Sequence, residues 1–214
     1  MSTQIEAFEV LKPGILTTVQ DLGRYGFSQF WVPPSGALDT FSFRVGNLLV
    51  GNQEEEGSLE TTVMGLKLKA LREIVIAITV GDLFPTLNGE SLEMWRTHLL
   101  VEDDVVTFKR IRSGCRAYLA LNGGFILPKI MGSRSTYLSG RFGGFQGRPL
   151  KRGDILYTPD RPLSLSKLGL RFPSDWIPSF EKEVMLKVIP GPQDHHFTEK
   201  GFQTFSSSAY QVTP

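Results

Sequence analysis

Three polar side chains end a strand-like run near the start of the chain, in the stretch TTVQDLGRYGF at 17–27. Gln20, Asp21 and Arg24 follow β-branched residues, and two glycines flank the arginine. A solvated turn would explain Asp21 and the glycines but would leave Gln20 and Arg24 without a purpose. A ligand site would use all three side chains. The stretch is therefore the first candidate for a binding site.

A second polar stretch, MGSRSTYLSGRFGGFQGR at 131–148, combines hydroxyl groups, guanidinium groups and glycines. Several backbone N–H groups and guanidinium donors in such a loop can converge on one carboxylate or phosphate, and glycines allow the ligand to approach the backbone. The loop therefore predicts a site for a small anion. Its candidate donors are Ser133, Arg134, Ser135 and Arg148.

Other candidate groups have a structural interpretation beside the chemical one. Asp39 is either a catalytic acid or the N-cap of a helix. Glu60 lies on a predicted strand, as a surface residue or as a site carboxylate. Cys115 fits a small buried residue better than a nucleophile. His195 and His196 are adjacent, so a strand would point them to opposite faces, and we predict no metal site.

Composition limits the class of protein. The chain has 214 residues, a formal net charge of +1 and one cysteine. No basic run points to nucleic acid or to an anionic membrane, and the longest apolar run, 74–80, is too short to span a bilayer. No secretion signal, G-x-S-x-G elbow or phosphate-binding G-x-x-x-x-G-K-[ST] loop is present. We expect a cytoplasmic protein that binds neither nucleic acid nor membrane.

Short apolar runs bounded by Gly, Pro, Asn or Asp predict a mainly β fold with few helices. LNGE at 87–90 has the Asn-Gly pair that a tight hairpin requires, because both central residues need positive φ. One helix is predicted after Asp39 and continues to Asn52. The predicted strands are 15–19, 74–80, 105–108, 117–121, 155–157 and 184–189.

The chain changes character at 159–178, where prolines accumulate and predict a connector. We therefore expect one domain at 1–180 and the start of a second β-rich unit at 181–214. A unit of that length is too short for a core of its own. We therefore expect the chain to be a truncated form of a longer protein.

An ordered series of motifs identifies the family that the chain resembles. The motifs resemble, in the same order, those of the allophanate hydrolase subunit 2 family. Its members are also described as biotin-dependent carboxyltransferase subunits, as the C-type subunit of 5-oxoprolinase and as antagonists of a sporulation-kinase inhibitor. Trp31 stands at a position where relatives usually have glycine. Relatives also continue into a segment resembling SDRMGYRL, which this chain lacks. The motifs are LTTVQDLGRYGF, VPPSGALD, GNLLVGN, LETTVMGLKL, CRAYLALNGGF, MGSRSTYLSGRFGGFQGRPLKRGD and VIPGPQDHHF.

The resemblance implies a cyclophilin-like β-barrel that acts as a non-autonomous subunit. The assembled complex would use ATP to open 5-oxoproline to glutamate. Its partners would be a related subunit of the kinase-inhibitor or allophanate hydrolase subunit 1 type and a lactam-utilisation subunit. The alternatives are a regulatory protein that sequesters a histidine-kinase inhibitor, or a carboxyltransferase component of a urea amidolyase system. No biotinyl-lysine site is present in this chain.

The same resemblance suggests a role for the first polar stretch. Gln20 would hydrogen-bond the amide edge of a small anionic amide, and Arg24 would hold its carboxylate. We then expect both side chains to converge on one cleft with the loop at 131–148. Alternatively, Asp21 and Arg24 pair with each other and brace the turn.

Overall fold

The computed structural model describes residues 4–163, 165–181 and 183–211. The chain divides into two compact units, Met1–Phe180 and Glu181–Pro214. The first unit contains all the strands of the described residues, and they pair throughout in antiparallel fashion. The prediction of a mainly β fold with few helices is confirmed.

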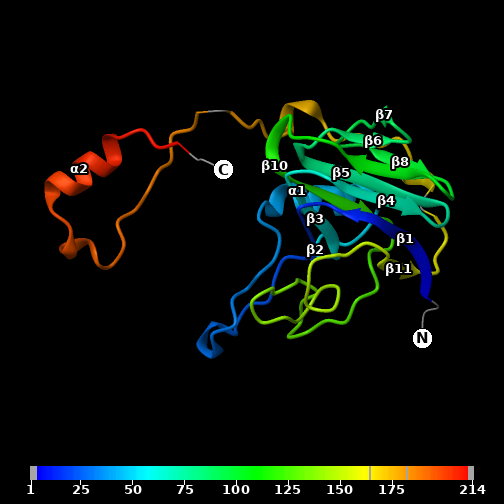
Figure 1. Cartoon of the computed structure of the whole chain (residues 1–214), viewed down its shortest axis with the longest axis horizontal. Helices are drawn as coiled ribbons and strands as arrows, with labels where there is room; N and C mark the ends of the chain where they lie inside the picture. Colours follow the sequence, from blue (N-terminus) through cyan, green and yellow to red (C-terminus); the bar gives the residue numbers. More distant parts are fainter. Residues whose placement is uncertain (1–3, 164, 182, 212–214) are drawn as a thin grey trace. The chain divides into compact units, whose positions relative to one another are not determined.

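The described strands form two sheets (Figure 1). The six-stranded sheet has the order β11-β1-β4-β9-β6-β7, and the five-stranded sheet has the order β2-β3-β10-β5-β8. Closure of these sheets into a cyclophilin-like barrel stays a prediction. The strands are β1 Gln4–Pro13, β2 Leu16–Gln20, β3 Ser58–Thr62, β4 Leu66–Ala70, β5 Ile74–Asp82, β6 Pro85–Leu87, β7 Glu90–Ser91, β8 Thr97–Leu100, β9 Val105–Phe108, β10 Ser113–Leu121 and β11 Ile155–Pro159.

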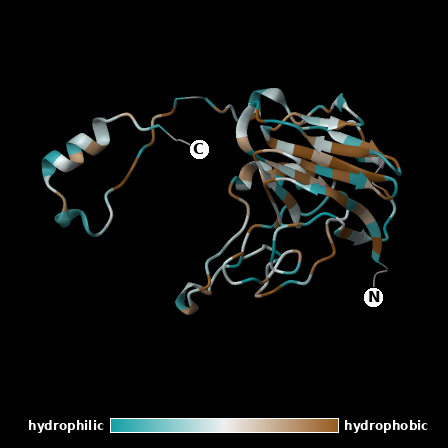
Figure 2. Ribbon diagram, in the orientation of Figure 1, coloured by the Kyte–Doolittle hydropathy of each residue, from teal (hydrophilic) through white to brown (hydrophobic). Residues whose placement is uncertain are grey.

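The main hydrophobic core draws on both sheets. Phe8 and Val106 come from the six-stranded sheet, and Leu59, Ile76 and Leu119 come from the five-stranded sheet. Burial of such side chains is the main favourable term in folding. The strands are accordingly the most hydrophobic part of the first unit in Figure 2.

The predicted strands of the first unit are confirmed to within a few residues. The strand predicted at 105–108 coincides with β9, and the runs at 74–80 and 117–121 lie inside β5 and β10. The Asn-Gly hairpin is also confirmed, because Asn88 and Gly89 have φ of 51° and 95° between β6 and β7.

One helix of the first unit, α1 at Thr40–Leu49, begins where the sequence predicted. Asp39 is its N-cap and accepts a hydrogen bond from the Ser42 backbone N–H at 3.0 Å. Phe43 faces the five-stranded sheet, where its ring meets Tyr118 edge-on with the centroids 5.5 Å apart. Gly46 allows close packing on that sheet, because a Cβ there would lie 3.1 Å from the Thr79 hydroxyl. The cap thus fixes the start of α1, which packs on β5 and β10.

The proline-rich segment at 159–178 is not the connector that we predicted. Its backbone pairs with the edge of β8, where Thr97 N–H donates to Leu170 C=O at 3.0 Å. Its apolar side chains pack on a second core beneath α1, which supplies the free energy that holds it in place. Those side chains are Leu163, Leu168, Phe172 and Ile177.

The second unit lacks the strand predicted at 184–189, because none of these residues pairs with a neighbouring strand. A strand needs a partner for its backbone N–H and C=O groups, and the apolar residues here are exposed, with Met185 at 94% and Ile189 at 93%. The unit instead contains α2 at Glu199–Ser207, capped by Thr198. None of the described residues at 181–214 lies in a strand, and the expectation of a second β-rich unit stays a prediction.

No helix in the described part of the chain is long and apolar enough to cross a membrane.

Candidate functional site

The structure brings the first polar stretch and the 131–148 loop together, and Asp21 is their meeting point. Its carboxylate accepts hydrogen bonds from the Ser133 hydroxyl at 2.6 Å and the Gly23 backbone N–H at 2.8 Å. The Ser135 hydroxyl and the Arg134 backbone N–H also donate to it. Figure 1 shows the two segments, blue and green to yellow, next to each other. The predicted convergence therefore occurs around a carboxylate of the chain itself. We call Asp21, Arg24, Ser133 and Ser135 the Asp21 cluster.

Arg24 completes the Asp21 cluster from the other side. Its side chain is 1% exposed and donates to the Ser35 hydroxyl at 3.1 Å and to the Ser135 backbone carbonyl. The guanidinium also lies over the Phe142 ring, 5.0 Å from its centroid. No direct ion pair joins Arg24 and Asp21 among the described residues, so Ser135 links them.

Burial and charge act on both ionisable groups of the cluster. Burial works to raise the pKa of Asp21, but the hydrogen bonds from Ser133, Ser135, Arg134 and Gly23 lower that pKa more. Burial lowers the pKa of Arg24, and attraction to Asp21 opposes this shift. The hydrogen-bond donors of the chain around Asp21 thus keep its carboxylate ionised inside the protein, without donors from a ligand.

The backbone explains the glycine beside this cluster. Gly23 has φ of 92°, and a Cβ there would lie 2.8 Å from the Ser35 carbonyl oxygen and 2.9 Å from that of Pro34. The chain doubles back at this point, with Arg24 N–H donating to Pro34 C=O at 2.8 Å. The Asp21 cluster therefore closes the base of the loop at 22–36.

Gln20 also stabilises this base. Its amide nitrogen donates to the Thr18 hydroxyl at 2.9 Å, and its carbonyl oxygen accepts from the Gly36 backbone N–H at 3.2 Å. Gln20 is 7% exposed and Asp21 is 4% exposed. A ligand would have to displace these internal contacts to reach either side chain, so the geometry favours a brace over a binding site.

Two arginines of the 131–148 loop are held by carboxylates away from the Asp21 cluster. Arg134 Nη1 lies 3.1 Å from Glu56 Oε1. Arg148 binds Asp154 through both terminal nitrogens, at 2.7 and 2.8 Å, and its other N–H groups donate to Gln146 and to the Pro149 carbonyl. These contacts use all the donors of the Arg148 guanidinium. We therefore leave Arg148 out of the candidate site.

The two remaining candidates, Asp39 and Glu60, meet at the N-terminus of α1. Glu60 Oε2 accepts from the Tyr118 hydroxyl at 2.8 Å and from the Leu38 backbone N–H at 3.1 Å. The same hydroxyl accepts from the Asp39 backbone N–H at 2.9 Å. Arg116 Nε lies 3.4 Å from Glu60 Oε1. We call Asp39, Glu60, Arg116 and Tyr118 the Glu60 cluster.

The Glu60 cluster reaches solvent, unlike the Asp21 cluster. The side chains of Arg116 and Glu60 are 28% and 12% exposed, whereas the Tyr118 ring beneath them is buried. Burial first, and then the Glu60 carboxylate, raise the pKa of Tyr118 above its ordinary value, so the phenol stays protonated and donates to Glu60. In the described structure the terminal nitrogens of Arg116 have no hydrogen-bond partner.

This arrangement suits a ligand that carries both donors and acceptors. The Glu60 carboxylate can accept a hydrogen bond from an amide N–H, and the Arg116 guanidinium can donate to a carbonyl or carboxylate oxygen. The N-terminus of α1 adds a partial positive charge beside them. The Glu60 cluster is therefore our candidate functional site.

Sequence reasoning missed Arg116 and Tyr118. Both lie on β10 in register with β3, where Tyr118 pairs with Glu60 and Arg116 pairs with Thr62. Residues two apart on a strand share a face, so the alternation in CRAYLAL carried the signal once the pairing with LETT was known. The pairing itself is a long-range contact that no local pattern indicates.

Comparison with known proteins agrees with the sequence motifs. The family described as "Carboxyltransferase domain, subdomain A and B" matches residues 30–214. Urea amidolyase of Lachancea kluyveri is 37% identical over 96% of this chain, which spans 12% of that protein. The C-type subunit of 5-oxoprolinase from Escherichia coli is 33% identical over 96% of this chain, which spans 64% of that protein.

A solved structure gives the same result for the fold. The crystal structure of K. lactis urea amidolyase matches with a TM-score of 0.74 and 37% identity, over 85% of this chain and 11% of that one. The prediction of the family from its motifs is confirmed. The chain belongs to the carboxyltransferase domain family, subdomains A and B.

Proposed function

We propose that the chain is a subunit of an ATP-dependent 5-oxoprolinase, in which the Glu60 cluster helps to hold the lactam. The observation that carries the proposal is the pairing of Glu60 with an Arg116 whose terminal nitrogens are free in the described structure. The relationship to the C-type subunit of 5-oxoprolinase supports it, at 33% identity over 96% of the chain.

The substrate has the groups that this pair would recognise. 5-Oxoproline carries a lactam N–H, a lactam carbonyl and a carboxylate. Glu60 would accept from the N–H, and Arg116 would donate to the carboxylate through two parallel N–H groups. Tyr118 would hold the Glu60 carboxylate in position from below.

Two arginines of the 131–148 loop are already engaged by carboxylates of the chain and are not free to bind the phosphates of ATP. In the 131–148 loop, the guanidinium groups of Arg134 and Arg148 are held by Glu56 and Asp154. All the N–H donors of Arg148 and one terminal nitrogen of Arg134 are therefore already used, whereas a triphosphate needs several cationic donors. We assign the nucleotide to another subunit, of the lactam-utilisation type or of the kinase-inhibitor type.

Reconstitution with those two partner subunits tests the proposal. We expect glutamate release from 5-oxoproline and ATP only when this chain is present, and none from the chain alone. In the complex, Arg116→Gln should raise KM for 5-oxoproline about tenfold or more, because a charge-assisted pair is lost. Arg152→Gln, which changes an exposed arginine of the turn after the loop, is the matched control.

A carboxyltransferase role in urea breakdown is the second candidate, because the urea amidolyases are related at 37% identity. Urea also offers N–H groups and a carbonyl to the Glu60 cluster but has no carboxylate. A biotin carrier would have to come from elsewhere, since this sequence has no biotinyl-lysine site. Urea-dependent loss of carboxyl from a carboxybiotin carrier, without glutamate release in the first assay, would decide for this alternative.

A further inference from the structure

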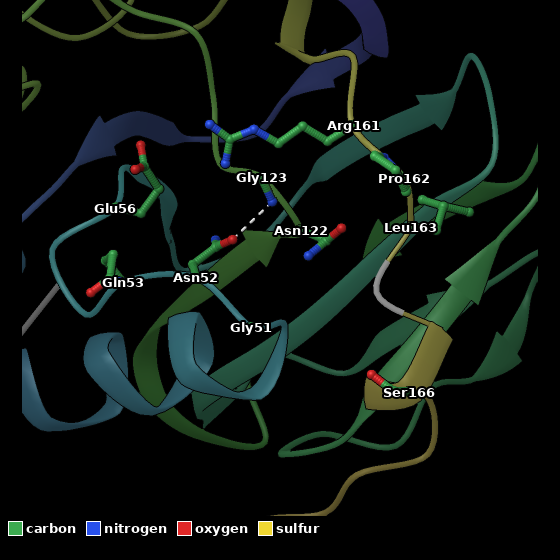
Figure 3. A pocket seen from close by; sticks show the side chains of 10 residues that line it. All are labelled: Gly51, Asn52, Gln53, Glu56, Asn122, Gly123, Arg161, Pro162, Leu163 and Ser166. Atoms are coloured by element: carbon green, nitrogen blue, oxygen red, sulfur yellow. Dashed lines mark hydrogen bonds between the residues drawn. The ribbon is translucent and has the colours of Figure 1, made fainter.

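A polar pocket lies at the other end of α1, away from the Glu60 cluster. Its volume is about 580 Å³, and it opens between the segment after α1, the end of β10 and the segment after β11 (Figure 3). Arg161 and Glu56 bring opposite charges to it, and Asn52, Gln53, Asn122 and Gly123 bring amide groups.

The floor of this pocket is rigid. Asn52 accepts from the Gly123 backbone N–H at 2.8 Å and donates to the Leu121 carbonyl at 2.8 Å, which ties the end of α1 to the end of β10. Asn122 donates to the Val50 carbonyl at 2.7 Å. These amides fix the shape of the pocket before any ligand enters, which lowers the entropic cost of binding.

The negative charge of the pocket is held in place. Glu56 Oε1 contacts Arg134 Nη1 at 3.1 Å and the Gly57 backbone N–H at 3.4 Å. The Glu56 side chain crosses Gly124, where a Cβ would lie 2.3 Å from Glu56 Cγ. The C-terminus of α1 beside Asn52 adds a partial negative charge. The Arg134 guanidinium offsets much of this charge through Oε1, and Glu56 Oε2, which has no hydrogen-bond partner among the described residues, is the oxygen left to accept from a ligand.

The positive charge of the pocket comes from Arg161 on the segment after β11. Figure 3 shows the Arg161 side chain extended over the pocket, with its guanidinium on the side of Glu56 and Gly123. No ion pair or hydrogen bond holds this guanidinium among the residues that the structure describes. Its donors are available to a carboxylate.

We propose that this pocket binds a free α-amino acid. The Arg161 guanidinium holds the ligand carboxylate, and the ligand ammonium group lies between Glu56 and the C-terminus of α1. Gln53 and Ser166, which also line the pocket, would contact the ligand side chain. The inference does not rest on the proposed function, because it concerns a pocket separate from the Glu60 cluster and a binding equilibrium rather than a reaction.

Calorimetric titration of the whole chain with L-glutamate and L-alanine tests the proposal. We expect binding of an amino acid that N-acetyl-L-alanine and 5-oxoproline do not reproduce, because neither carries an ammonium group. Arg161→Gln should weaken amino-acid binding about tenfold or more. Arg152→Gln is the matched control and should leave the affinity unchanged, and neither change should alter the melting temperature, since both side chains are exposed.

A second variant separates the two charges. Glu56→Gln keeps an oxygen for Arg134 but removes the negative charge, so amino-acid affinity should fall while any weak binding of the N-acetyl compound stays the same. Absence of amino-acid binding at millimolar concentration would overturn the proposal. So would binding that Arg161→Gln does not weaken, or equal binding of L-alanine and its N-acetyl derivative. Loss of amino-acid binding without loss of activity in the reconstituted complex would leave the proposed function intact.

Discussion

Replacing Asp21 by asparagine should destabilise the first unit strongly. The substitution keeps the size of the side chain but removes its charge and turns one acceptor oxygen into a donor. Asp21 accepts from Gly23, Ser133, Arg134 and Ser135, so a new N–H₂ group must face a donor that has no other partner. Arg24 would also lose the nearby negative charge that offsets its burial.

The size of the effect follows from these two losses. A hydrogen bond to a charged group contributes about 1.5–3 kcal/mol. A buried charge deprived of its partner costs about 3–5 kcal/mol. Because Asp21 and Arg24 share Ser135 as a hydrogen-bond partner, their contributions are coupled, and we expect about 3–5 kcal/mol in total rather than the sum. For a unit of this size, that lowers the melting temperature by about 6–20 °C.

Urea denaturation and calorimetry of Asp21→Asn against the unmodified chain measure this loss. Asp160→Asn, which changes an exposed aspartate, is the matched control and should cost less than about 0.5 kcal/mol. A loss below about 1 kcal/mol for Asp21→Asn would refute the role of Asp21 as the buried anchor of two loops.

Three further predictions concern the Asp21 cluster with its neighbouring turn and the Glu60 cluster. The pKa of Asp21 is lower in the folded chain than in the unfolded chain. The contribution of its carboxylate to the free energy of unfolding is therefore complete above the unfolded pKa, about pH 4, and is lost as the pH falls through the folded pKa. The difference in free energy of unfolding between the unmodified chain and Asp21→Asn should close over that range. Gly23→Ala should destabilise more than Gly26→Ala in urea denaturation, since both have positive φ but only Gly23 has backbone atoms within 3.0 Å of a Cβ; equal losses would contradict this. Tyr118→Phe should cost about 1–3 kcal/mol by the same method, because it leaves the Asp39 N–H without its acceptor; a neutral result would contradict the geometry.

Local patterns in the sequence were enough to predict β2, β5, β9, β10, β11 and the start of α1, but they did not indicate β1, β4 or β8. The alternation and turn residues that mark β5, β9 and β10 act over a few neighbours, as does the cap at Asp39. The prediction of a connector at 159–178 failed because the structure of this segment depends on tertiary packing and not on local sequence. Its prolines suggested a connector, but packing of Phe172 on Trp95, with ring centroids 5.6 Å apart, overrides the local preference.

The candidate site was predicted only in part, for a physical reason. The sequence correctly indicated that the stretch at 17–27 and the 131–148 loop converge, but it could not tell whether a ligand or Asp21 occupies the meeting point. That distinction depends on burial, since Arg24 at 1% exposure has no access to solvent. Arg116 and Tyr118 stayed hidden because their link to Glu60 depends on strand register.

Arg24→Met tests most directly whether Arg24 is a brace or a ligand-binding residue, with melting temperature and activity in the reconstituted complex measured on the same variant. Methionine fills much of the volume of the arginine stem but cannot bond to Ser35 or to the Ser135 carbonyl. If Arg24 is a brace, the melting temperature falls clearly, and turnover per folded complex is unchanged well below that temperature. An unchanged melting temperature with a collapse of 5-oxoproline turnover would contradict it, because Arg24 would then be a ligand-binding residue and not a brace.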